Sequence, residues 1–101
     1  MITEKQELLK YLDEKGRIKV WPSKNKKIAR AEMLQYLADK FEYEKFYKEK
    51  EVNEIISHWH TFGDYFLLRR ELIIAALLYR TNDGSKYWRE VKQDDAGAFF
   101  H

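Results

Sequence analysis

The stretch VNEIISHWHTFGDYFLLRRELIIAALLYRTNDGSKYWREV, residues 52–91, decides the fold of this 101-residue chain. Apolar residues recur at i, i+3, i+4 and i+7 spacing from Val52 to Trp59, which predicts a helix that ends near His60. After a short turn, Asp64 is a typical N-cap for another helix, over residues 65–75. The stretch therefore begins with two helices joined by a tight turn.

The end of the same stretch predicts a β-hairpin. Asp83-Gly84 is a strong turn signal, and the segments on either side of it, residues 77–81 and 86–91, are rich in aromatic and apolar residues. Tyr87 and Trp88 are consecutive and point to opposite faces of a strand, so one of the two rings is expected in the core. Two helices followed by a hairpin are typical of the winged form of the helix-turn-helix plan, although another small α+β arrangement has the same periodicity.

Further elements are predicted outward from this stretch, toward the N-terminus. An apolar stripe with a capping-box start predicts a helix over residues 4–14, with Gly16 as its stop. Ser23 is the expected N-cap of a longer helix that runs to about Phe41. A short extended piece is predicted at residues 46–47.

The predicted fold class is α+β and mostly helical. It is a winged helix-turn-helix with an added N-terminal helix and a C-terminal β-hairpin wing. We expect a single winged-helix domain over residues 1–91 and a flexible tail over residues 92–101.

The composition indicates a chain that folds by itself. With 45% hydrophobic and 16% aromatic residues, the chain has enough apolar material for one core. It contains no cysteine, which excludes a disulfide framework, a thiolate zinc finger and a cysteine nucleophile. The longest apolar run, Leu72 to Tyr79, is too short to span a bilayer, and the N-terminus lacks the pattern of a signal peptide. We expect a cytoplasmic protein without membrane contact.

No pattern of catalytic or metal-ligating residues is found. The sequence has no nucleophile with its base, no glycine-rich phosphate loop and no pair of carboxylates placed for acid–base chemistry. His58 and His60 stand at i, i+2 positions, which point apart on a helix. We therefore expect no enzyme, no metal and no cofactor, and the sequence identifies no small-molecule substrate.

Several motifs resemble one known family. GRIKVWPSKNKK (16–27), YKEKEVNEII (47–56), HWHTFGDYFLLRREL (58–72) and a hairpin that closes on YWR (87–89) are similar to the family catalogued as domain of unknown function 2087. Members of that family occur alone or beside helix-turn-helix regulator domains and acetyltransferases, so the resemblance implies a regulatory or accessory module. This chain departs from the family where relatives tend to have glycine after the LRREL helix, because it has Ala76 there. It also has apolar Ile74 and Ala75 where relatives are often polar.

The distribution of charge points to an anionic partner. Residues 15–31 hold seven of the 19 basic residues and no acidic one, which leaves 12 basic residues against 17 acidic ones elsewhere. Lysines at the start of a helix are repelled by its dipole, by about 0.3–1 kcal/mol each, so a phosphate held there offers an explanation; a solvated lysine-rich loop is the alternative. We predict a DNA-binding module of a transcriptional-regulator type. Its expected contacts are Lys24, Lys26, Lys27, Arg30, Arg69, Arg70, Lys86 and Arg89.

A different function is indicated by the helix predicted over residues 65–75, which is apolar nearly all round. Such a helix is normally buried on both sides, here by the N-terminal helix or by a second copy of the chain. On this interpretation Arg69 and Arg70 pair within the chain, and the module serves protein–protein interaction, as a homodimer or as part of a larger regulator. The expected interface residues are Phe66, Leu67, Ile73, Ile74 and Leu77.

Overall fold

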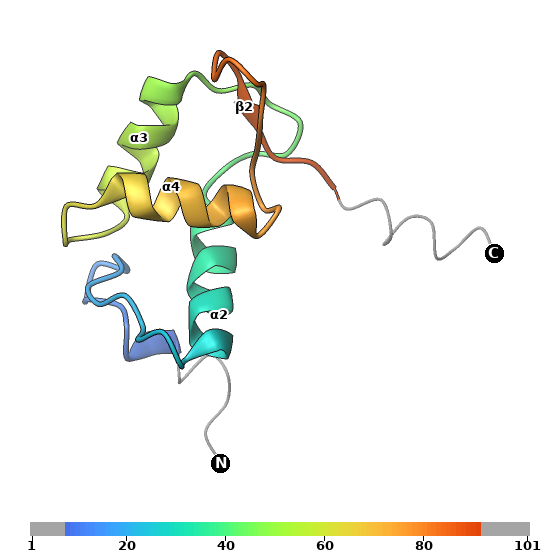
Figure 1. Cartoon of the computed structure of the whole chain (residues 1–101). Helices are drawn as coiled ribbons and strands as arrows, with labels where there is room; N and C mark the ends of the chain where they lie inside the picture. Colours follow the sequence, from blue (N-terminus) through green and yellow to red (C-terminus); the bar gives the residue numbers. More distant parts are fainter. Residues whose placement is uncertain (1–7, 92–101) are drawn as a thin grey trace.

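The structure, a computed structural model, describes residues 8–91. Figure 1 shows three labelled helices in this part of the chain, with a hairpin beside the upper end of α3. The elements are α2 (Lys27–Ala38), α3 (Glu49–His58), α4 (Tyr65–Ile74), β1 (Tyr79–Arg80) and β2 (Tyr87–Trp88). The fold is α+β and mostly helical, as predicted. None of the helices within residues 8–91 has the length and apolar character needed to cross a membrane.

The core is formed where α4 packs against both α2 and α3. Leu68 and Leu72 of α4 are completely buried, one helical turn apart. They meet equally buried side chains, among them Leu37 from α2 and Ile56 from α3. Burial of a side chain of this size stabilises the fold by about 1.5–3 kcal/mol. These contacts fix which side of α4 faces the solvent.

The turn between α3 and α4 is closed by His60 and by Asp64, the N-cap that the sequence predicts. The His60 ring is buried, with Nδ1 at 2.7 Å from the Ile56 carbonyl oxygen, while its Nε2 accepts a hydrogen bond from the Asp64 backbone N–H at 2.9 Å. These partners define a neutral ring protonated at Nδ1. Asp64 then caps α4, because its Oδ1 accepts a hydrogen bond from the Leu67 N–H at 3.1 Å.

The hairpin pairs Tyr79 with Trp88 and Arg80 with Tyr87 in antiparallel register. Tyr47 adds a bridge at the other edge of β2, where it exchanges two backbone hydrogen bonds of 2.8 Å with Tyr87. The Tyr87 side chain is buried and Trp88 stacks on Tyr79 at the surface. The prediction that the two neighbouring rings face opposite sides is confirmed.

The helix predicted from Ser23 to Phe41 is shorter in the structure. The Ser23 hydroxyl donates a hydrogen bond to Asn25 Oδ1 at 2.8 Å, and the Ser23 carbonyl accepts one from the Lys26 N–H at 2.9 Å. These bonds form a separate turn before the helix. The expected cap at Ser23 is therefore wrong: α2 begins at Lys27, after an N-cap Lys26 without a side-chain hydrogen bond.

The N-terminal helix also ends earlier than predicted. Residues 4–7 of its predicted range lie outside the described residues, and helical geometry ends at Leu9, not at residue 14. The chain then turns, and Leu12 forms a bridge with Ile18. The physical reason is that Asp13 binds backbone N–H groups further along the chain, which competes with helix formation.

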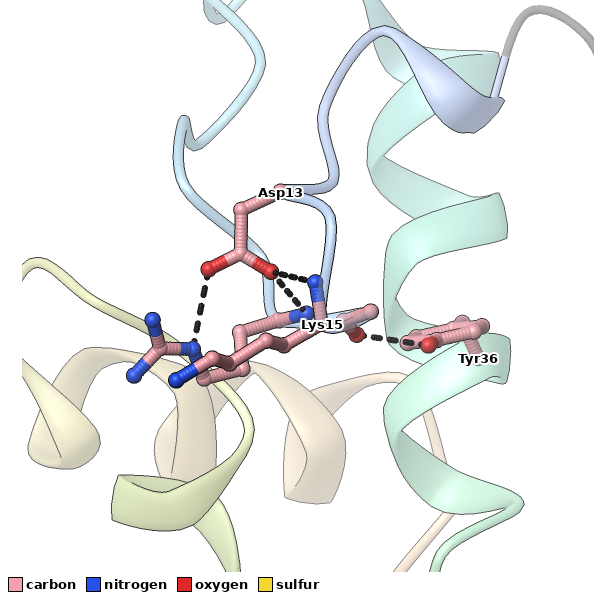
Figure 2. A network of polar contacts seen from close by, with 5 residues as sticks. Asp13, Lys15 and Tyr36 are labelled. Atoms are coloured by element: carbon pink, nitrogen blue, oxygen red, sulfur yellow. Dashed lines mark hydrogen bonds and ion pairs between the residues drawn. The ribbon is translucent and has the colours of Figure 1, made fainter.

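Figure 2 shows how this turn is anchored on α2. The Asp13 carboxylate accepts hydrogen bonds from the backbone N–H groups of Arg17 and Lys15 and from the Arg17 guanidinium, and these lower the pKa of Asp13. The Tyr36 hydroxyl of α2 donates a hydrogen bond of 2.6 Å to the Gly16 carbonyl oxygen. Gly16 has a φ of +80°, which glycine adopts without strain. The flexible tail predicted over residues 92–101 lies outside the described residues.

Ala76, just after α4, adopts a left-handed conformation with a φ of +58°. The N–H groups of Leu77 and Leu78 both return to the Leu72 carbonyl oxygen, so the helix closes in the manner usually assigned to glycine. The departure from the family pattern noted in the sequence therefore falls on a residue that carries backbone strain.

We predict that Ala76→Gly raises the free energy of unfolding by about 0.5–1 kcal/mol, because relief of the left-handed strain outweighs the added entropy of the unfolded chain. Urea denaturation measures the change. Ala75→Gly is the matched control, since Ala75 has a right-handed φ of −79° and its replacement is expected to lower stability. A loss of stability in Ala76→Gly contradicts the prediction.

Candidate nucleic-acid interface

A first hollow, of about 520 Å³, lies between the N-terminal part of α2 and the end of α4. We call it the α2–α4 hollow. The cations Lys24, Lys27 and Arg30 line it, together with Gln35. Its apolar lining comes from Ala31, Leu34, Ala75 and Leu77.

A second hollow, of about 300 Å³, lies between α4 and the hairpin, and we call it the α4–hairpin hollow. Three arginines line it: Arg69, Arg70 and Arg80. The remaining lining is Phe66, Ile73, Ile74 and Tyr87. At the end of α4, Ile74 borders the second hollow and its neighbour in sequence, Ala75, borders the first.

No carboxylate lines either hollow among the described residues. Every ionisable side chain that does so is a lysine or an arginine, apart from Tyr87. Lysine and arginine side chains therefore lie beside α4 in both hollows, although the formal net charge of the whole chain is only +2. Just outside the lining of the second hollow, Glu49 contacts Arg69 and the Tyr87 hydroxyl, and Glu71 contacts Arg70. The local field, and not the net charge, determines which ligand is attracted.

Three lysines at the start of α2 are open to solvent. Lys24 lies in the preceding turn, Lys26 is the N-cap and Lys27 is the first helical residue. No acidic residue follows in the first turn of α2, and none of these lysines forms an ion pair within residues 8–91. Their mutual repulsion and their repulsion by the helix dipole are left uncompensated within the described chain.

Arg30, in contrast, is held by the protein itself. Its Nε donates a hydrogen bond of 2.8 Å to the Pro22 carbonyl oxygen, and its guanidinium lies 5.3 Å from the centre of the Trp21 ring. The side chain is half-buried, yet it still lines the α2–α4 hollow. Arg30 therefore presents a cation of fixed orientation.

The two arginines of α4 have different environments. The side chain of Arg69 is only 15% exposed and is engaged by Asn53 and by Glu49 at 3.9 Å, both on α3. The side chain of Arg70 is 57% exposed, with a loose contact of 3.9 Å to Glu71. Pairing within the chain, the alternative considered from the sequence, thus describes Arg69, whereas Arg70 faces solvent.

The hairpin cations predicted from the sequence do not join this surface. Arg89 is buried, donates to the Phe41 carbonyl oxygen and to Asp39 at 2.7 Å, and covers the Tyr43 ring at 4.0 Å. The Arg89 guanidinium is used within the fold, where it joins the residue after β2 to the chain at the end of α2. Lys86 is exposed but lies over Phe46 on the opposite face of the hairpin, in a hollow that also contains two glutamates, Glu44 and Glu90.

Arg80 is a candidate that the sequence reasoning missed. It is exposed, and no hydrogen bond or ion pair engages it within the described chain. The hairpin register pairs Arg80 with the buried Tyr87, which places it beside α4. Side chains alternate between the two faces of a strand, which is why Tyr87 and Trp88 point to opposite sides. Once the hairpin register is known, the same alternation predicts that Arg80 lies beside α4.

The five residues of the predicted apolar interface differ in how far they are buried. Phe66 and Ile74 are 57% and 70% exposed, and they flank Arg70 on the outer side of α4. Leu67 is half-buried, and Ile73 and Leu77 are half-buried and pack against the core. Only two of the five predicted residues therefore offer a large free apolar surface.

Replacing Arg89 by glutamine tests its structural role. We expect Arg89→Gln to lower the free energy of unfolding by about 1–2 kcal/mol through lost hydrogen bonds, a value reduced because Asp39 is 57% exposed and screened by water. Lys86→Gln removes the same charge from the exposed face and is expected to stay within about 0.5 kcal/mol of the wild type. Thermal unfolding of both variants provides the measurement, and equal stabilities mean that Arg89 is not a structural residue.

Comparison with known proteins identifies the family of this chain. The family model described as "uncharacterized protein conserved in bacteria (DUF2087)" matches residues 17–89. No curated protein and no solved structure matches the chain. The matched range contains α2, α3, α4 and both strands, and therefore both hollows. The chain belongs to the DUF2087 family.

Proposed function

We propose that this protein is a winged-helix module that binds DNA through the basic surface at the end of α4, as part of a transcriptional regulator. The single observation that supports this proposal best is the charge of the two hollows. Six cations line them and no carboxylate among the described residues does. A phosphate backbone is the polyanion that such an extended cationic surface suits.

The order of elements supports the winged-helix part of the proposal. Helices α2, α3 and α4 are followed by a hairpin, and Tyr47, between α2 and α3, pairs with β2. In a winged helix-turn-helix, the helix after the tight turn is the one presented to DNA. Here that helix is α4, whose inner side is buried and whose outer side carries the solvent-facing Arg70.

The exposed cations have separable roles in the proposal. Lys24, Lys26 and Lys27 hold phosphates on one side of α4, and Arg80 holds the backbone on the hairpin side. Arg70 is the side chain placed to reach a base edge, for which a bidentate contact with guanine is the usual arginine interaction. Arg30 adds a pre-oriented cation next to the lysines.

We expect labelled duplex DNA to bind with an affinity that falls steeply as salt rises. In Lys24→Ala/Lys26→Ala/Lys27→Ala, the slope of log K against log salt becomes shallower by about one unit per lost phosphate contact. Fluorescence anisotropy over a series of salt concentrations measures both slopes. The matched control is Lys45→Ala/Lys48→Ala/Lys50→Ala, which removes the same charge from a segment with no residue in either hollow, whereas Lys24 and Lys27 both line the α2–α4 hollow.

Two outcomes contradict the proposal. If the wild type does not bind duplex DNA at low salt, the basic surface is not a nucleic-acid site. If both triple variants lose affinity equally, binding depends on total charge and not on the hollows at α4.

A second candidate function, self-association through α4, is favoured by one observation. Phe66 and Ile74 expose large apolar side chains on the same side of α4, eight residues apart. Exposed apolar patches of this kind mark contact surfaces. A homodimer formed through this face would cover Arg70, which lies between the two apolar side chains, so self-association here is an alternative to DNA binding through α4.

For this second function we expect the wild type to exceed the monomer mass in sedimentation equilibrium and Phe66→Ser/Ile74→Ser to return to it, because burying the two side chains drives association. Ile28→Ser is the control, since Ile28 is 77% exposed on α2 and lines neither hollow. A wild type that stays monomeric at the highest soluble concentration rules out the dimer.

A further inference from the structure

The α2–α4 hollow has a chemical character that phosphate binding alone does not use. Leu34 and Leu77 form an apolar floor, and Ala75 extends it toward the end of α4. Lys24, Lys27 and Arg30 provide all of the charge. A phosphate group satisfies the cations but leaves the floor in contact with water.

The charged and the apolar lining residues lie at different places along the hollow. Lys27 and Leu34 are seven residues apart on α2 and so lie on one face, two turns from each other. Lys27 therefore lies at the end of the hollow nearest the start of α2, and Leu34 lies further along it. A ligand that matches both must have an anionic group at one end and an apolar body behind it.

Two features limit the cost of ordering the hollow when a ligand binds. The Arg30 guanidinium is already held by Pro22 and by the Trp21 ring. Leu77 is held by the hydrogen bond from its N–H to the Leu72 carbonyl oxygen, 3.0 Å long. A pre-ordered wall and cation lose little conformational entropy on binding. The volume of about 520 Å³ also lies within the range of small-molecule sites, roughly 300–1,000 Å³.

We propose that the α2–α4 hollow binds an amphipathic organic anion, a carboxylate or sulfonate on a short alkyl or aryl body. The anionic group contacts Lys24, Lys27 and Arg30, and the apolar body covers Leu34, Ala75 and Leu77. Binding itself does not depend on the proposed DNA function. If that function holds, the ligand competes with a phosphate for Lys24 and Lys27 and acts as an effector.

The probe for this site is 8-anilinonaphthalene-1-sulfonate, whose fluorescence rises in apolar surroundings. We expect saturable binding by the folded wild type and displacement of the probe by octanoate. Octanol has the same chain without the charge, and inorganic phosphate has the charge without the chain. Neither is expected to displace the probe at the concentrations at which octanoate does.

Paired variants locate the binding. Ala75→Glu places a carboxylate in the hollow and is expected to weaken probe and octanoate binding by about tenfold or more, whereas Ala75→Gln, of similar size, retains it. Lys24→Ala is expected to weaken binding, whereas Lys26→Ala, which removes a lysine that does not line this hollow, is not. Circular dichroism confirms that each variant is folded.

Three results overturn the proposal. Displacement by phosphate as effective as by octanoate identifies a simple anion site. Displacement by octanol as effective as by octanoate identifies an uncharged apolar site. Equal binding by Ala75→Glu and Ala75→Gln places the probe elsewhere. Duplex binding measured without the probe is a separate test, so failure of this site and failure of the DNA function are distinguished.

Discussion

Leu68 and Leu72 are buried between α2 and α3, and this contact determines the orientation of α4. Once these two side chains face inward, the opposite side of a ten-residue helix must face the solvent. Phe66, Arg70 and Ile74, at i, i+4 and i+8, are among the residues that this geometry leaves outside. The same packing contact therefore decides which residues of α4 are buried in the core and which form its outer surface.

The cations of the chain divide into those that the fold uses and those that it leaves free. Arg89 and Arg69 have short contacts with oxygen atoms of neighbouring elements and are largely buried. Lys24, Lys27 and Arg80 are exposed and have no carboxylate partner in the described chain. Lys24 and Lys27 line the α2–α4 hollow and Arg80 lines the α4–hairpin hollow, and their placement beside α4 supports an anionic partner more strongly than the formal net charge does.

Periodicity and capping residues predicted much of the fold. The i, i+3, i+4, i+7 pattern located α3, and Asp64 located the start of α4, because both signals are local. The start of α2 was missed, since Ser23 binds Asn25 and does not cap the helix. The end of the N-terminal helix was missed because Asp13 captures backbone N–H groups up to four residues ahead.

The candidate site was harder to predict, because it depends on tertiary contacts. Nothing local distinguishes Arg89, which is buried against Asp39, from Lys86, one strand position away from Tyr87 and exposed. Arg80 joins the surface only through the hairpin register. The lysines at the start of α2 were recognised because they are clustered in the sequence. They are the one part of the site that local charge reveals.

We propose that DNA binds at the surface beside the end of α4. Titration of ¹⁵N-labelled protein with a short duplex, followed by backbone amide chemical shifts, shows where the duplex lies. We expect the largest changes on residues 24–30, on Arg70 and the end of α4, and on Arg80. Changes centred on the Trp88 face of the hairpin, or on α3 away from both hollows, contradict the proposal.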